Sequence, residues 1–292
     1  MQTLKKIIAE AEVKKIAIGH FNVSDIAALK GIVRAAEELK VPVIIGLSEG
    51  ERNFFGIEEA ALIVRNLREK HGLPVYLNAD HTYSIENVKK AVEAGCDAVI
   101  FDGAKLPLEE NIAKTKEVVQ YVKSVSANRR TGILVEGELG YIGTSSELFT
   151  EIPTGAAIKE EDLTTVEDAV RFVKETGVDM FAPAVGNIHG MSISTPNPNL
   201  NITRIKAIKD AVGIPIVLHG GSGIKDVDFV SAAGAGISLI HINTEIRLAW
   251  KEALQKSLAG NSNEIAPYKL LKLSEEAVYE VASRRLKLFA KL

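Results

Sequence analysis

The sequence predicts an α/β fold: a closed (β/α)8 barrel, or TIM barrel, with extra helices at its C-terminus. Short apolar, β-branched runs alternate eight times with segments of helical periodicity, which is typical of a parallel sheet covered by helices on its outer side. Three junctions repeat a helix end, a Gly turn and a strand, in EAGCDAVIF, ETGVDMFAP and GAGISLIHI. No G-x-G-x-x-G turn follows the first run, so a doubly wound open sheet is the second choice.

The elements follow one another in regular order. The expected strands are Ile16–Phe21, Val43–Leu47, Val75–Asn78, Ala98–Phe101, Ile133–Glu136, Met180–Val185, Ile216–Leu218 and Ser238–Ile242. Helical spacing predicts helices that include Ile26–Leu39, Ile57–Lys70, Ile85–Glu93, Glu109–Val122 and Val166–Glu175. We expect an active-site loop at Tyr141–Glu161 and one or two extra helices at Pro267–Leu292, all within one domain spanning residues 1–292.

Composition argues against several classes of partner. The net charge of −3 gives no reason to expect nucleic acid or a membrane surface as a partner. The single cysteine, Cys96, cannot form an internal disulfide, which fits a reducing compartment. The first residues, MQTLKKIIAEAEVKK, alternate charged and apolar residues at helical spacing and do not resemble a signal peptide. Because no stretch of about 20 apolar residues occurs either, we expect a cytoplasmic protein.

Polar residues gather at the predicted strand ends, where barrels of this kind carry their working residues. In chain order they are Asp80 and His81, Glu136 and Glu138, His189, His219 to Gly223, then His241, Asn243 and Thr244. His81, His189 and His219 would thus meet at one rim. Three neutral imidazoles with an open fourth position form a catalytic Zn²⁺ site, although each histidine taken singly could be a hydrogen-bonded loop residue.

Other polar residues allow two interpretations each. The segment HGGSG after the seventh strand is predicted to open a helix and, with Ser222 and the nearby Asn243-Thr244, to bind a phosphate; the alternative is a flexible turn. Asp80, beside His81, is a candidate proton donor and acceptor, or a group that orients His81. The remaining histidines, His20, His71 and His241, are predicted to be structural.

These residues lie in motifs that occur in a known order: GHFNVSD, LNADHTYS, FDGAKLPLEENI, VEGELGYIG, VGNIHG, LHGGSGI and INTEIR. Over nearly its whole length the chain resembles the class II, metal-dependent fructose- and tagatose-bisphosphate aldolases. The resemblance implies one Zn²⁺ per subunit, held by His81, His189 and His219, and a proton exchange between Asp80 and the C4 hydroxyl. It further implies a phosphorylated sugar substrate, a monovalent cation (Na⁺ or K⁺) near the phosphate, and a homodimer or homotetramer.

The resemblance also assigns roles to residues around this centre. Glu147, offset by about one residue from the usual position, would be the base at C3. Asp102 and Glu136 would offer the metal an alternative position. The substrate and its phosphate would be bound by Asn22, Ser48, Gly190, Gly221, Ser222, Asn243 and Thr244.

The chain departs from the family's pattern at three places. Met191-Ser192-Ile193 stands where a lysine is usual, and His241 stands where the family has Asn. The family's D-P-R, whose arginine reaches the far phosphate, is replaced by Ala266-Pro267-Tyr268, and Lys269 is the nearest candidate to take over that contact. These changes concern the far half of the substrate more than the cleavage chemistry.

The expected reaction is cleavage of fructose 1,6-bisphosphate to dihydroxyacetone phosphate and glyceraldehyde 3-phosphate. Tagatose 1,6-bisphosphate or another ketose phosphate is the alternative substrate. A metal-dependent hydrolase would prefer a His-x-His pair on the first strand, which ends in GHFN. A Schiff-base aldolase would need a lysine in the sixth strand, DMFAPAV, which has none. A non-catalytic protein that binds metal or sugar phosphate remains a third possibility.

Overall fold

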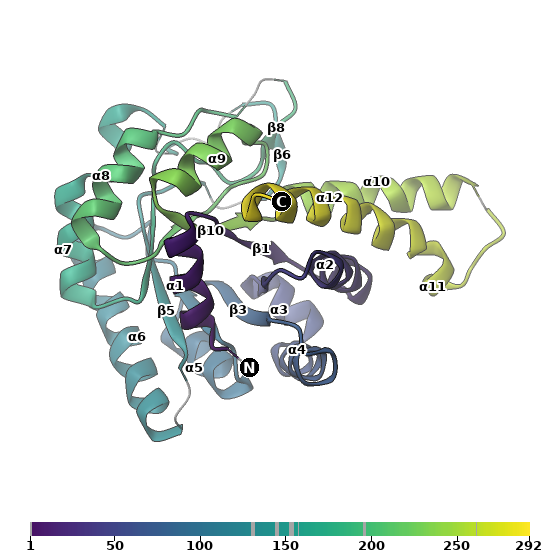
Figure 1. Cartoon of the computed structure of the whole chain (residues 1–292), viewed down its shortest axis with the longest axis horizontal. Helices are drawn as coiled ribbons and strands as arrows, with labels where there is room; N and C mark the ends of the chain where they lie inside the picture. Colours follow the sequence, from purple (N-terminus) through teal and green to yellow (C-terminus); the bar gives the residue numbers. More distant parts are fainter. Residues whose placement is uncertain are drawn as a thin grey trace.

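The structure, a computed structural model, describes residues 2–129, 132–143, 146–151, 155–156, 158–194, 197–260 and 262–292. At its centre parallel strands form a closed barrel in the order β1-β10-β9-β7-β5-β4-β3-β2, which confirms the predicted fold (Figure 1). The barrel strands are β1 Ile18–Asn22, β2 Val43–Leu47, β3 Val75–Thr82, β4 Ala98–Phe101, β5 Leu134–Leu139, β7 Met180–Pro183, β9 Ile216–Leu218 and β10 Ile237–Ile242. The predicted strands coincide with these, with ends shifted by a few residues.

Helices surround the barrel. They are α1 Leu4–Lys14, α2 Ile26–Leu39, α3 Glu49–Phe55, α4 Ile57–His71, α5 Ile85–Ala94, α6 Leu108–Arg129, α7 Val166–Thr176, α8 Ile202–Val212, α9 Asp226–Ala235, α10 Thr244–Gly260, α11 Pro267–Leu270 and α12 Lys272–Ala290, with a 3₁₀ turn at Glu160–Asp162. The five helices predicted by range are present, and α11 with α12 form the expected C-terminal pair. No helix among the described residues is both long enough and apolar enough to cross a membrane.

Helix α1 closes one end of the barrel. Its buried residues Leu4, Ile7 and Ile8 join one apolar cluster with side chains from the strands, among them Ile18 and Tyr76. These strand residues lie at or near the strand starts, so α1 covers the N-terminal end. The C-terminal strand ends are therefore left as the place where a polar site can form, as the fold leads us to expect.

Two loops are joined at the C-terminal end. The short strands β6 (Leu148–Phe149) and β8 (Met191–Ser192) pair in parallel and tie the segment after β5 to the segment after β7. The predicted active-site loop Tyr141–Glu161 includes β6, but its residues 144, 145, 152–154 and 157 lie outside the described residues. Its described part borders the mouth of the barrel through Ser146.

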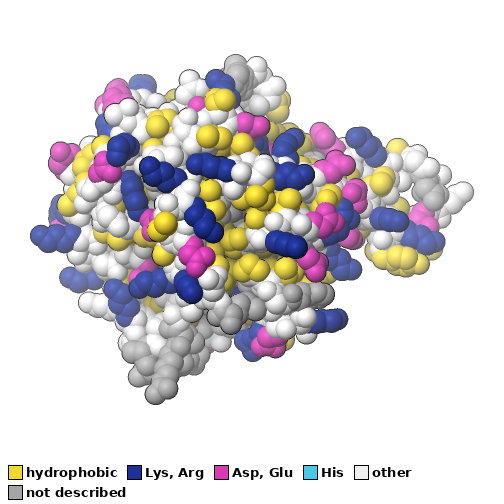
Figure 2. Space-filling view, viewed as in Figure 1, with side chains coloured by type: hydrophobic (Ala, Val, Ile, Leu, Met, Phe, Trp, Pro, Cys, Tyr) yellow, Lys and Arg dark blue, Asp and Glu magenta, His cyan; other side chains and the backbone are white. Residues whose placement is uncertain are grey.

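The C-terminal helices form an extension that leaves the barrel. Helices α10 and α12 lie side by side, and α11 lies at their far end (Figure 1). Apolar side chains gather at that end (Figure 2), where Ile265 is 86% exposed and Tyr268 is 77% exposed. Exposed apolar groups of this kind often mark a contact surface.

A buried arginine fixes α12 to the loops of the open end. Arg285, 6% exposed, places Nη2 2.6 Å from Glu245 Oε1 and Nη1 2.7 Å from Asp226 Oδ1. Glu245 Oε1 also accepts a hydrogen bond from the backbone N–H of Gly223 (3.1 Å). The C-terminal helix therefore holds together the loop after β9 and the start of α10.

Replacing this arginine should destabilise the fold. In Arg285→Ala the buried carboxylate of Glu245 loses its main partner, and we expect a loss of about 3–5 kcal/mol in the free energy of unfolding. Its neighbour Arg284 contacts the same carboxylate at 3.4 Å but is 61% exposed, so Arg284→Ala should change stability little. Urea unfolding of both variants measures the difference. Equal, small effects would contradict the role given to Arg285.

Candidate metal centre and anion-binding pocket

A cavity of about 140 Å³ opens at the C-terminal ends of the strands. Its lining comes from loops that are far apart in the sequence. The lining residues are Asn22, Ser48, Asp80, His81, Tyr83, Ser146, His189, Gly190, Gly220, Ser222, His241, Asn243, Thr244 and Arg247. Most of the site residues predicted from the sequence are therefore brought together here.

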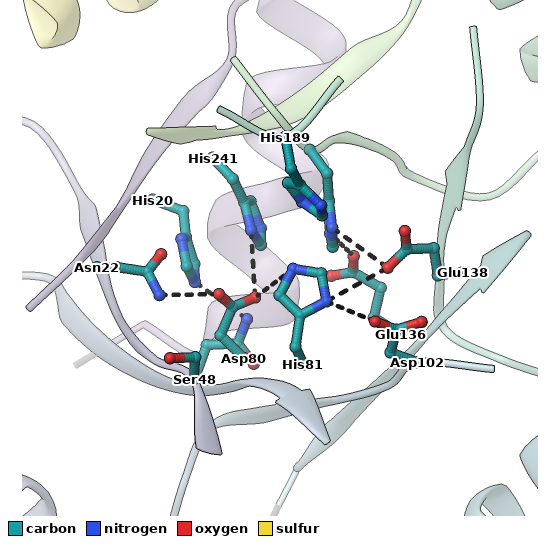
Figure 3. Close-up of polar contacts among 12 residues, drawn as sticks. His20, Asn22, Ser48, Asp80, His81, Asp102, Glu136, Glu138, His189 and His241 are labelled. Atoms are coloured by element: carbon teal, nitrogen blue, oxygen red, sulfur yellow. Dashed lines mark hydrogen bonds and ion pairs between the residues drawn. The ribbon is translucent and has the colours of Figure 1, made fainter. Parts of the chain in front are cut away.

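The three predicted histidines meet at this cavity. The ring centroids of His81 and His189 are 4.8 Å apart, those of His81 and His219 are 4.9 Å apart, and those of His189 and His219 are 5.9 Å apart. One nitrogen from each ring lies within 4.8 Å of the others. Figure 3 shows His81 and His189 in one cluster of side chains, with strands of the barrel around them. Three imidazoles at this spacing can share one metal ion.

Each of these rings is hydrogen-bonded through its other nitrogen. The bonds run from His81 Nδ1 to Asp102 Oδ2 (2.9 Å), from His189 Nδ1 to the Gly143 carbonyl (2.7 Å) and from His219 Nε2 to Glu136 Oε1 (2.7 Å). Because carbonyls and carboxylates accept, each bonded nitrogen is the donor, and the opposite nitrogen is the one that can bind a metal once it carries no proton. His219 Nδ1 is buried and has no hydrogen-bond partner among the described residues. The donor set therefore fits a metal.

An irregularity in β3 places Asp80 and His81 in the same pocket. The pairing of β3 with β4 shifts register between Ala79 and Thr82, so these two residues share the space opposite one residue of β4. His81 also has a φ of 41°, in the left-handed region that non-glycine residues rarely adopt. Neighbours on a regular strand point to opposite faces, and this bulge lets both side chains line the cavity.

Asp80 is buried and surrounded by donors. Its Oδ2 accepts from Asn22 Nδ2 (2.8 Å), and its Oδ1 lies 3.5 Å from His241 Nδ1 and 3.9 Å from His81 Nε2 (Figure 3). Burial alone would raise the pKa of Asp80, but His81 and His241 outweigh it and hold the pKa well below its usual range. The residue therefore presents an ionised carboxylate to the cavity.

His241 was predicted to be structural, yet it lines the cavity. Its ring stacks on His20 with centroids 3.5 Å apart and planes at 4°, and on His219 with centroids 4.2 Å apart. Burial lowers the pKa of His20 to about 4 and that of His241 well below its usual range. His20, Asp80 and His241 are close enough to suggest a second metal site. Lone pairs in parallel ring planes do not converge on one ion, however, so the stack is a poor ligand pair.

Glu138 is a site residue to which the sequence assigned no role. Its Oε2 lies 3.5 Å from His81 Nδ1 (Figure 3) and 3.4 Å from His219 Nδ1, so one carboxylate is close to two of the histidines. Burial and the nearby Asp102 carboxylate raise its pKa to about 8. The available signal was the period of two along β5, which directs Glu136 and Glu138 to the same face.

The predicted phosphate segment is arranged differently from expectation. Helix α9 begins only at Asp226, so HGGSG does not open it. Instead Ser222 Oγ accepts hydrogen bonds from the backbone N–H groups of Asn243 (3.3 Å) and Glu245 (3.2 Å), at the start of α10. Gly221 is not part of the cavity lining, and its N–H donates to the backbone carbonyl of His241 in β10. Gly220, the residue before it, does line the cavity.

Polar atoms in this part of the pocket lack partners. Thr244 Oγ1 and Asn243 Oδ1 are buried, and neither has a hydrogen-bond partner among the described residues. Gly220 has a φ of 59°, and a Cβ there would lie 2.3 Å from the carbonyl of Ile188. The Thr244 hydroxyl can donate to an anion beside Gly220, whereas Asn243 Oδ1 can only accept.

Two predicted residues, Glu147 and Lys269, neither line the described cavity nor contact the three histidines. Glu147 is exposed next to β6, and its backbone carbonyl accepts from the N–H of Met191 (2.9 Å). Lys269 lies on α11, at the far end of the extension (Figure 1), with Nζ 2.9 Å from Glu264 Oε2. Within this one chain neither side chain joins the described pocket. Conversely Arg247, the last residue of the INTEIR motif, lines the pocket although sequence reasoning gave it no role.

Metal binding at neutral pH should release protons. Burial would lower the pKa of His81, but Asp80, Asp102 and Glu138 outweigh it and raise the pKa well above its usual value. Metal-free His81 therefore carries a proton on both ring nitrogens at pH 7, and a metal must displace one of them. We expect release of about one proton or more per metal ion bound. Calorimetric Zn²⁺ titrations in buffers of different ionisation enthalpy measure this number. Asp102→Asn should reduce it, and a heat independent of the buffer would contradict the assignment.

Comparisons with known proteins identify the family to which the chain belongs. The family model described as fructose-bisphosphate aldolase class-II matches residues 2–291. The fructose-bisphosphate aldolase of Geobacillus stearothermophilus is 34% identical over 279 residues, 94% of this chain and 92% of that protein. The 6-phospho-5-dehydro-2-deoxy-D-gluconate aldolase of Shouchella clausii is 35% identical over 286 residues, 97% of this chain and 92% of that protein. The crystal structure of the YdjI aldolase from Escherichia coli K12 matches with a TM-score of 0.79 at 32% identity, covering 99% of this chain and 96% of that one. The chain therefore belongs to the class II fructose-bisphosphate aldolase family.

Proposed function

We propose that this class II aldolase uses Zn²⁺ to cleave a ketose 1,6-bisphosphate, with fructose 1,6-bisphosphate as the first candidate substrate. The products would be dihydroxyacetone phosphate and glyceraldehyde 3-phosphate. One observation carries the proposal: the imidazoles of His81, His189 and His219 meet beside the ionised carboxylate of Asp80. Aldol cleavage needs an electrophile at the ketone and a proton acceptor at the hydroxyl, and this pocket can supply both.

Zn²⁺ is the proposed metal because nitrogen donors in a tetrahedral set with one open position suit it. His81, His189 and His219 would hold it, and it would act there as a Lewis acid on the substrate's ketone. The hydrogen bonds from His81 to Asp102 and from His219 to Glu136 support an orienting role for both carboxylates.

Asp80 is the proposed base of the cleavage step. It would take the proton from the C4 hydroxyl as the C3–C4 bond breaks, because its depressed pKa keeps it ionised at neutral pH. Asn22 donates to its Oδ2 at 2.8 Å and holds the carboxylate in place. After cleavage C3 needs a proton, for which Glu147, the neighbour of the lining residue Ser146, is the proposed source.

The phosphate of the dihydroxyacetone half would lie against the start of α10. The unpartnered hydroxyl of Thr244 can donate to it, and Gly190, Gly220 and Ser222 leave room for its close approach. The unpartnered Asn243 Oδ1 is an acceptor suited to the proposed monovalent cation, Na⁺ or K⁺.

A homo-oligomer remains part of the proposal. Ile265 and Tyr268 leave apolar surface exposed at the end of the extension (Figure 2). A second copy of the chain could cover that surface, which supports the expected homodimer or homotetramer.

Relatives suggest a second substrate to test. The name of the Shouchella clausii relative specifies a phosphorylated gluconate, which carries a carboxylate where fructose 1,6-bisphosphate carries its second phosphate. Tagatose 1,6-bisphosphate differs from the fructose sugar only at C4. A Schiff-base mechanism is disfavoured because the residues lining the described pocket include no lysine.

The test is cleavage of fructose 1,6-bisphosphate, tagatose 1,6-bisphosphate and 6-phospho-5-dehydro-2-deoxygluconate, with triose phosphate measured by a coupled assay. We expect cleavage of at least one of them, abolished by chelator and restored by Zn²⁺. Cleavage that survives chelation and is trapped by borohydride would contradict the proposal in favour of a lysine intermediate.

Asp80→Asn separates catalysis from binding. The substitution removes the base but not the metal-binding rings, so Zn²⁺ content should be unchanged while kcat falls by about 10²–10⁴-fold. Wild-type protein that binds Zn²⁺ and sugar phosphate but cleaves none of the sugars would instead indicate a non-catalytic binding protein.

A further inference from the structure

The pocket has a deep part and a rim. Asp80 and Thr244, which line the deep part, are each 3% exposed. The Arg247 side chain, by contrast, is 44% exposed. It leaves α10 one turn after Thr244, and its guanidinium lies between α3 and the segment after β5. Nη2 is 2.7 Å from Glu51 Oε1, and Nη1 is 3.4 Å from the carbonyl of Ser146. The exposed rim of the pocket therefore carries a cationic side chain.

Arg247 is the one lysine or arginine among the described residues that line the cavity. The remaining lining consists of Asp80, histidines and uncharged groups. A substrate with two anionic ends can place one end at the start of α10. The other end then has a single cationic side chain available within the described pocket.

The guanidinium is held in place by a fixed carboxylate. Glu51 is 6% exposed, and its Oε2 accepts from Asn22 Nδ2 (2.8 Å), the Ser48 N–H (2.8 Å) and Ser48 Oγ (2.9 Å). A guanidinium has five N–H donors, and within the described residues only two bonds from Arg247 are formed. The remaining donors can bind two oxygens of one anion in a fork.

We propose that Arg247 determines specificity by binding an anionic group, phosphate or carboxylate, at the end of the substrate remote from the first phosphate. The assignment rests on the proposed aldolase function and adds to it the residue that recognises the far half. It also accounts for the position of Lys269, which lies at the far end of the extension and is paired with Glu264. Glu51 acts as a positioning residue that orients the arginine.

The direct test is the condensation reaction with dihydroxyacetone phosphate. A bond forms between its C3 and the aldehyde carbon. C3 loses one proton and the aldehyde oxygen gains one to become the new hydroxyl, so no other reactant is needed. Three aldehydes are compared: uncharged D-glyceraldehyde, glyceraldehyde 3-phosphate and malonate semialdehyde, which carries a carboxylate. Arg247→Gln should lower the ratio of kcat/KM for the preferred anionic aldehyde to that for D-glyceraldehyde by about 10- to 100-fold.

Two further variants sharpen this result. Arg247→Lys keeps the charge but loses the fork, so its ratio should lie between those of the wild type and Arg247→Gln. Arg171→Gln is the matched control, since Arg171 is 41% exposed and pairs with Glu109 and Glu175 on the outer helices. It should leave the ratio unchanged. Thermal unfolding and Zn²⁺ content establish that each variant is folded and loaded.

Two outcomes would overturn the assignment. Arg247→Gln could reduce kcat/KM equally for all three aldehydes, or it could raise KM for dihydroxyacetone phosphate while the ratio stays constant. Either result would place Arg247 at the first phosphate or in a purely structural role. The preferred aldehyde in the wild type distinguishes phosphate from carboxylate as the recognised group.

A second experiment measures ligand binding and does not depend on turnover. Calorimetry of the Zn²⁺-loaded protein compares three ligands that have no ketone to cleave: glucitol 6-phosphate, glucitol 1,6-bisphosphate and gluconate 6-phosphate. A ligand with the second anion should bind more tightly to the wild type, and Arg247→Gln should remove that advantage. An inactive wild type with this behaviour would refute the aldolase proposal but support anion recognition. Equal affinities in the wild type would refute the role of Arg247.

Discussion

The site depends on hydrogen bonds that fix one nitrogen of each histidine of the candidate metal centre. Asp102, the Gly143 carbonyl and Glu136 each accept from one ring, so the opposite nitrogens of the three rings face one point. These acceptors come from β5 and from the loops after β4 and β5, and the closed barrel sets their positions. The bulge in β3 adds the last requirement, because it brings Asp80 into the same pocket as His81. Without these constraints the same residues would form an ordinary polar rim.

The same arrangement explains the charges around the pocket. Buried carboxylates surround His81 and raise its pKa, while burial and its histidine neighbours lower the pKa of His189 to about 3. The metal-free site is thus held together by shared protons, and a cation can replace them without leaving the carboxylates unpaired. Asp80 stays ionised within this network, so one cluster could serve both for the proposed metal binding and for the proposed proton transfer.

The sequence predicted the parts of this account that follow from regular periodicity. Parallel strands end at one edge of a barrel, so the positions of His81, His189 and His219 after their strands were enough to bring them together. It could not predict contacts set by tertiary packing, such as the stacking of His241 on His219 or the path of Arg247 to α3. The HGGSG segment was misassigned for a similar reason: local composition suggested a helix start, whereas Ser222 interacts with the start of α10, which lies later in the chain.

The role proposed for each residue of the pocket follows from how deeply its side chain is buried. In the proposed account the buried groups at the strand ends would bind the metal and transfer the proton, and the exposed rim would recognise what varies between substrates. The central claim is the position of the metal, and anomalous diffraction at the zinc edge from a Zn²⁺-loaded crystal tests it most directly. We predict one peak at about 2.0–2.1 Å from His81 Nε2, His189 Nε2 and His219 Nδ1. A peak coordinated by Asp102 and Glu138, with His189 left unbound, would contradict the account.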